Sequence, residues 1–116
     1  MKTNIVTSGL GREPDVEAEI TLLPTAAGGR HTPAASGYRP GHKVRDDYIT
    51  SGAHHYIGRD TLAPGETCLA TITFITPEVY PNCLWVGRDI DIQEGSRVVG
   101  RAHITKIFNA VLTKVA

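Results

Sequence analysis

Cysteine is scarce in this chain, and long apolar runs are absent from it. Only Cys68 and Cys83 occur, fifteen positions apart, and this spacing is typical of neither a zinc site nor a disulfide framework. We therefore expect both thiols to be reduced. No run of about eighteen apolar residues occurs, and residues 1–7 lack the apolar segment of a signal peptide. These absences predict a cytoplasmic protein that makes no membrane contact.

The chain also lacks an excess of charge of either sign. Twelve Lys and Arg residues balance twelve Asp and Glu residues, so the whole molecule has no field that would attract nucleic acid or anionic lipid. Apolar residues make up 41% of the 116 positions, which is ordinary for a folded domain of this size. We expect one compact core, and any basic surface must be local.

Alternation of apolar and polar residues with a period of two is the main pattern along the chain. It is clearest in residues 16–22, 67–75 and 97–108, where β-branched residues are frequent, and it predicts half-buried strands. No stretch before residue 108 has a helical period, so we predict an all-β fold. Shorter candidate strands are residues 43–49, 53–57, 84–86 and 90–92, and Trp85 in the third of these is expected in the core.

Glycine and proline are concentrated in residues 24–41, which excludes a helix there and predicts a long structured loop. Strand signals about ten residues apart are typical of a small barrel or sandwich. The predicted organisation is a flexible lead-in at residues 1–14, a domain at 15–109, and a tail at 110–116 that frays or forms one helical turn.

Four short segments of the chain resemble a known family. They are GGRHTP at residues 28–33, GYRP at 37–40, EGSRVVG at 94–100 and ITKI at 104–107. In order and spacing they resemble the C-terminal, third domain of bacterial elongation factor Tu, over roughly residues 16–109. The resemblance implies a six-stranded antiparallel closed β-barrel, taken from a GTP-dependent carrier of aminoacyl-tRNA.

The chemistry of a GTPase is not expected here. No Gly-rich loop ending in Gly-Lys-Ser/Thr occurs in the chain, so we predict no nucleotide binding, no enzyme activity and no cofactor. Ser36, His31 and Asp46 stand without any catalytic motif. The adjacent His54 and His55 would point to opposite faces of a strand, and we expect structural or surface histidines without a metal site.

RNA contact is the functional candidate that the resemblance implies, because the family's third domain touches the T stem of tRNA. Residues 28–45 also form a local basic stretch, although a solvated loop with paired charges is the plainer interpretation. Two departures from the family pattern, Gly41 and Gln93, should weaken the contact. The candidate RNA-binding residues are Arg30, Tyr38, Arg39, Lys43, Thr50, Glu94 and Gly95, and the candidate partner-face residues are His31, Thr32 and Pro33.

Two functional hypotheses follow for a non-catalytic binding module. In the first, the domain makes a weak contact with tRNA, on the order of 10⁻⁴ to 10⁻⁶ M, or with translation proteins. In the second, it is a decoy or adaptor that presents the factor's third-domain surface to a protein partner such as a toxin or regulator. A protein partner is expected because a solitary domain exposes faces that the whole factor covers, and tRNA is a weaker possible partner. A divergent domain with an unrelated role is a third alternative.

Overall fold

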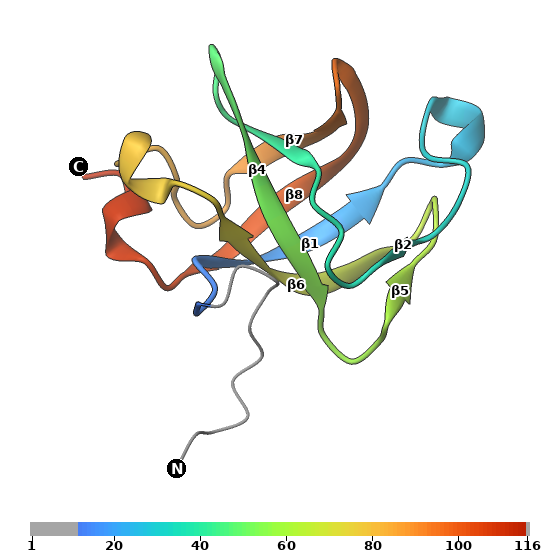
Figure 1. Ribbon diagram of the computed structural model, residues 1–116, viewed down its shortest axis with the longest axis horizontal. Coiled ribbons are helices and arrows are strands. Elements are labelled where there is room, and N and C mark those ends of the chain that lie inside the picture. Colours follow the sequence, from blue (N-terminus) through green and yellow to red (C-terminus); the bar gives the residue numbers. More distant parts are fainter. Residues whose placement is uncertain (1–11, 116) are drawn as a thin grey trace.

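The computed structural model describes residues 12–115, so the predicted lead-in lies outside the described residues except for its last three positions. The fold is all-β, as predicted, and its main feature is a closed barrel of six antiparallel strands in the order β1-β6-β4-β3-β7-β8 (Figure 1). The barrel strands are β1 (Val16–Leu22), β3 (Gly41–Arg45), β4 (Tyr48–Tyr56), β6 (Thr67–Phe74), β7 (Asp89–Glu94) and β8 (Arg97–Ile107).

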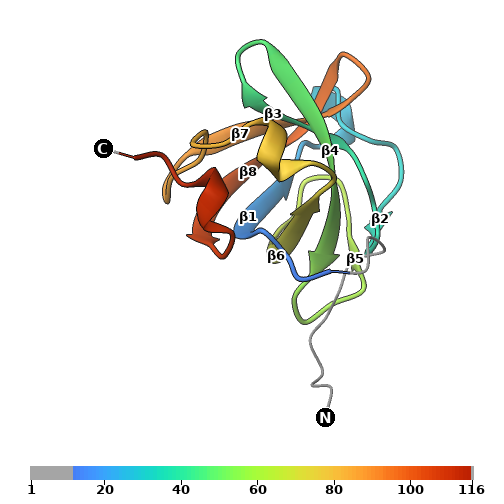
Figure 2. The same cartoon turned by 60° about the vertical axis from the view of Figure 1, so that its left-hand side comes forward.

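Short elements cover the two ends of the barrel. The strands β2 (Ala34–Ala35) and β5 (Thr61–Leu62) form a separate two-stranded sheet, and the first 3₁₀ turn is η1 (Thr25–Ala27). The turns η2 (Pro77–Val79) and η3 (Ala110–Leu112) lie side by side at the other end (Figures 1 and 2). Of the two alternatives given for residues 110–116, fraying or one helical turn, the structure has a short 3₁₀ turn at Ala110–Leu112. Within residues 12–115, no helix is long and apolar enough to cross a membrane.

β1 shows how alternation builds and closes the barrel. Val16, Ala18, Ile20 and Leu22 are fully buried, because every second side chain of a strand points to the same face. Ile20 lies opposite Cys68 of β6 on one side and opposite Ala102 of β8 on the other. The first barrel strand is thus paired with the last one, which removes the free edges of the sheet.

The buried carboxylate of Asp15 links the start of β1 to two neighbouring segments. Asp15, which is fully buried, accepts hydrogen bonds from the Phe74 backbone amide and the Asn109 side-chain amide, both at 2.8 Å. Arg12 donates two further hydrogen bonds to its two carboxylate oxygens. Buried carboxylates are tolerated only when they are paired in this way, so Asp15 joins the start of β1 to the ends of β6 and β8.

Two of the predicted strands were wrong. Residues 43–49 are not one strand, because β3 ends at Arg45 and β4 begins at Tyr48 after a turn at residues 46–47. Residues 84–86 are not a strand either, since Leu84 makes only an isolated bridge to Thr113. Trp85 was expected in the core but is 43% exposed, because this loop runs over the end of the barrel.

Candidate binding surface

Three of the residues that the sequence singled out meet around one carboxylate. Glu94, at the end of β7, accepts hydrogen bonds from both Arg30 and the Tyr38 hydroxyl. The Arg30 guanidinium carbon also lies 4.5 Å from the centre of the Tyr38 ring, which is cation–π distance. We call these three residues the Glu94 network. It joins the loop after η1, the loop before β3 and the β7–β8 turn.

The network fixes the charge of its members. The hydrogen bond from Tyr38, and then that from Arg30, lowers the pKa of Glu94, so the carboxylate is ionised at neutral pH. Burial and the hydrogen bond to Glu94 raise the pKa of Tyr38, which keeps its hydroxyl protonated as a donor. Arg97 approaches the other Glu94 oxygen at 3.6 Å. The positive charge of Arg30 is therefore largely neutralised within the domain.

The remaining cationic candidates are not neutralised in this way. Arg39 is exposed, and Lys43 lies on the outer face of β3, where it is partly exposed. Within residues 12–115, neither side chain forms an ion pair with a carboxylate. The pairing of Gly41 with Gln93 brings β3 beside β7, so both cations lie on chain segments adjoining the network. Gly95 occupies the β7–β8 turn with φ +63°.

The other candidates have different surroundings. Thr50 is 4% exposed and its hydroxyl lies 2.8 Å from the Tyr80 hydroxyl, so the structure places it inside the barrel and away from the network. His31, Thr32 and Pro33 are exposed. Arg30 donates hydrogen bonds to the Thr32 and Pro33 carbonyl oxygens at 3.1 and 3.3 Å. Arg30 therefore positions the loop that carries the candidate partner face.

Sequence reasoning missed a pair of buried histidines. His42 on β3 and His54 on β4 are both fully buried, and their Nε2 atoms lie 2.7 Å apart. His42 Nδ1 donates to the Thr50 carbonyl oxygen at 3.3 Å, so a neutral His42 must accept at Nε2 from the Nε2–H of His54. This leaves the lone pair of His54 Nδ1 buried without a partner. The sequence did contain a signal. His42 lies two positions before buried Val44, and His54 lies two positions before buried Tyr56, so strand alternation places each histidine on a buried face.

Burial also sets the protonation of this pair. Burial lowers the pKa of His42 to about 4. Burial, together with repulsion from His42, lowers the pKa of His54 well below its usual value. Both imidazoles are neutral at neutral pH, and the pair is part of the core.

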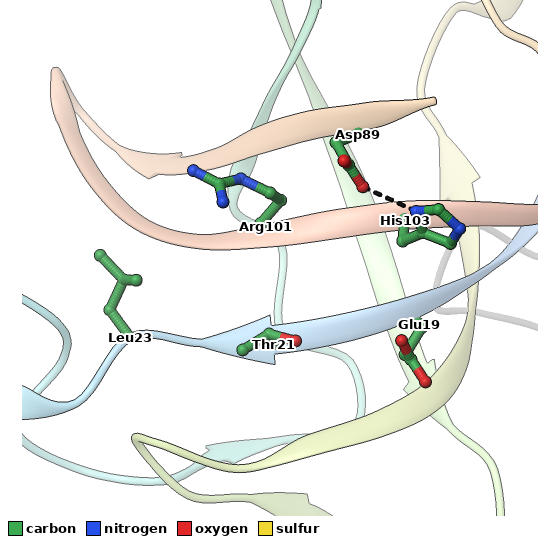
Figure 3. Close-up of a pocket in the computed structure, with 6 residues that line it drawn as sticks. All are labelled: Glu19, Thr21, Leu23, Asp89, Arg101 and His103. Carbon is green, nitrogen blue, oxygen red and sulfur yellow. Dashed lines mark hydrogen bonds and ion pairs between the residues drawn. The ribbon is translucent and has the colours of Figure 1, made fainter. Parts of the chain in front are cut away.

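A shallow hollow of about 350 Å³ lies on the outer face of β1, β7 and β8. Figure 3 shows the His103 ring directed at Asp89, and the His103 Nδ1 atom lies 2.7 Å from the Asp89 carboxylate. Glu19 and Thr21 on β1 line the other side of the hollow. Arg101 lies 3.8 Å from Asp91. Thr21 has the one hydroxyl group among the described lining residues, and this group lies 2.9 Å from the Thr67 hydroxyl.

No three metal-ligating side chains within residues 12–115 are arranged to hold a metal ion. Cys68 and Cys83 are both free. Comparison with models of known protein families gives no match to this chain.

Proposed function

We propose that this chain is a non-catalytic binding module, related to the third domain of elongation factor Tu, that makes a weak and salt-sensitive contact with tRNA. The observation that carries the proposal is the Glu94 network. Arg30, Tyr38 and Glu94 come from the GGRHTP, GYRP and EGSRVVG segments, on which the resemblance rests, and they meet around one carboxylate. Glu94 lies 64 residues from Arg30 and 56 residues from Tyr38 along the chain, so segments that are distant in the sequence form one surface.

The charges around the network support attraction to a phosphate backbone. Because Glu94 neutralises Arg30, the candidate residues that supply free positive charge to this surface are Arg39 and Lys43. Two phosphate contacts by a small module give only weak binding at physiological salt, on the order of 10⁻⁴ to 10⁻⁶ M. Arg30 then has a positioning role, in which it holds the loop and the Tyr38 ring in place.

The test is binding of fluorescently labelled tRNA, followed by anisotropy at low and at physiological salt. The Arg39→Ala/Lys43→Ala variant should weaken binding and reduce the slope of log affinity against log salt by about 2. The matched control is Arg59→Ala/Lys106→Ala, which removes the same charge elsewhere and should bind as the unchanged protein does. Absence of tRNA binding by the unchanged protein at low salt would contradict the proposal.

A protein partner is the second candidate, and exposed apolar side chains favour it. Ile57 and Leu69 are 48% and 41% exposed, and the Ile57 amide donates to the Leu69 carbonyl oxygen, so the two residues are neighbours. A domain that mimics the factor's third-domain surface should compete with full-length factor for a protein that binds it. Failure to compete at saturating concentration would remove this candidate, and Ile57→Lys/Leu69→Lys tests whether the apolar pair takes part.

A further inference from the structure

A second cationic site lies apart from the Glu94 network, near η3. It is a hollow of about 320 Å³ whose lining includes Arg45, Trp85, Arg88 and Lys114, and we call these four residues the Trp85 site. They come from three segments: the end of β3, the loop between η2 and β7, and the chain after η3.

Backbone hydrogen bonds hold the loop between η2 and β7 against the chain around η3. The Asn82 and Leu84 amides donate to the Val111 and Leu112 carbonyl oxygens, at 2.9 and 2.8 Å. The Lys114 amide donates in turn to the Leu84 carbonyl oxygen at 2.8 Å. Lys114 is therefore fixed beside the loop, although it lies close to the end of the chain.

The two arginines are positioned by carbonyl groups. Arg88 Nη1 donates to the carbonyl oxygens of Val44 and Cys83, and Arg45 Nη2 donates to that of Pro81 at 3.0 Å. Each guanidinium has five N–H donors, so each retains donors for a ligand after these bonds. The Arg88 guanidinium carbon lies 4.9 Å and the Lys114 ammonium nitrogen 5.0 Å from the centre of the Trp85 ring, both at cation–π distance.

The charge of the site is not balanced within the domain. Within residues 12–115, none of Arg45, Arg88 and Lys114 forms an ion pair with a carboxylate. Asp46 is the one acidic residue among the described lining, so three cations face one carboxylate. Cations held close together repel each other, and an anion bound between them removes that repulsion.

We propose that the Trp85 site binds the phosphate group of a small molecule. Two arginines and a lysine supply the charge-assisted donors that phosphate accepts, and arginine matches its geometry with paired donors. The site does not include any residue of the Glu94 network, so this inference is independent of the proposed tRNA contact.

Trp85 is the only tryptophan in the chain, and it reports on the site directly. The full chain is titrated with inorganic phosphate, adenosine 5′-monophosphate or adenosine at constant ionic strength, and Trp85 emission and the amide NMR shifts of residues 82–88 are recorded. We expect a saturable change with phosphate or with the monophosphate, and none with adenosine. Equal affinities indicate free phosphate as the ligand, whereas tighter monophosphate binding indicates an organic phosphate.

Arg45→Ala and Lys114→Ala should each weaken this binding by about tenfold. The matched control is Lys106→Ala on β8, which removes one exposed positive charge outside the site and should leave the affinity unchanged. A lack of saturable change up to about 10 mM ligand would overturn the proposal. So would an equal response to adenosine, or equal binding by the Arg45→Ala, Lys114→Ala and Lys106→Ala variants.

Discussion

Arg30 and Tyr38 both donate hydrogen bonds to Glu94, and the loss of either bond should lower the free energy of unfolding. Tyr38→Phe removes one hydrogen bond to a charged acceptor and keeps the ring under Arg30, so it should lower the free energy of unfolding by about 1.5 kcal/mol. Urea unfolding measures this change. Arg59→Ala is the control, since its ion pair with Glu66 is exposed and exposed ion pairs contribute little to stability. An equal loss in both variants would contradict the central role of Glu94.

The buried histidine pair predicts a loss of stability in mild acid. Both folded-state pKa values lie below the unfolded value of about 6.5, so the unfolded chain binds more protons as the pH falls from about 6.5 towards 4. Stability is complete above that window. Protonation of the unfolded chain at His42 should cost about 2 kcal/mol between pH 7 and pH 5, and His54 adds to the loss in the same direction. Urea unfolding at several pH values measures the slope.

The surroundings of the pair explain why acid should have this effect. The rings that face it belong to Tyr38, Tyr56 and Phe74, and no carboxylate in the described part of the chain hydrogen-bonds to either imidazole. His42→Leu/His54→Leu should therefore flatten the pH dependence, while the exposed-site control His103→Asn should retain it. If the double variant keeps the full acid dependence, the pair is not its cause.

Among the larger elements, the segment after β8 contributes more than the sequence suggested. Residues 110–116 were predicted to form a tail outside the domain, but Leu112 is fully buried and its carbonyl oxygen accepts from the Leu84 amide. Leu112→Ala should lower the free energy of unfolding by about 2 to 5 kcal/mol and shift Trp85 emission to longer wavelength. Val115→Ala, at a position 74% exposed, should change neither quantity.

Strands were predictable where alternation was regular. Residues 16–22 and 67–75 match β1 and β6 closely, because one face of each is buried against the same core. The prediction failed at residues 43–49, where a short turn of two aspartates interrupts the β-branched and aromatic residues around it. It failed again at 84–86, because three apolar residues in a row cannot distinguish a strand from a loop.

The candidate surface was predictable in part. Tyr38 and Glu94 were named from the resemblance and Arg30 from the local basic stretch, yet their meeting depends on the pairing of β3 with β7, which no local pattern shows. Thr50 was named as well, but its strand turns its hydroxyl towards Tyr80. The histidine pair and the Trp85 site depend on contacts between segments far apart in the chain, and side-chain types alone do not predict such contacts.

Closure of the barrel predicts that residues 12–115 unfold as one cooperative unit. β1 pairs with both β6 and β8, Asp15 joins the ends of these strands, and Leu112 packs in the same core cluster as Val16 and Ile104. No part of the described chain therefore retains a core of its own when another part unfolds. Small single domains of this kind unfold in one transition, and folding that depends on distant strand pairing takes milliseconds to seconds.

We therefore expect far-ultraviolet circular dichroism, which reports on the barrel strands, and Trp85 emission, which reports on the η3 end, to give the same urea midpoint. The two probes should also give the same slope with urea, because each follows the exposure of the entire core. A Trp85 transition at lower urea than the dichroism transition would mean that the segment after β8 detaches while the barrel remains closed. In that case Leu112→Ala would move only the first midpoint, whereas in the cooperative molecule it moves both together.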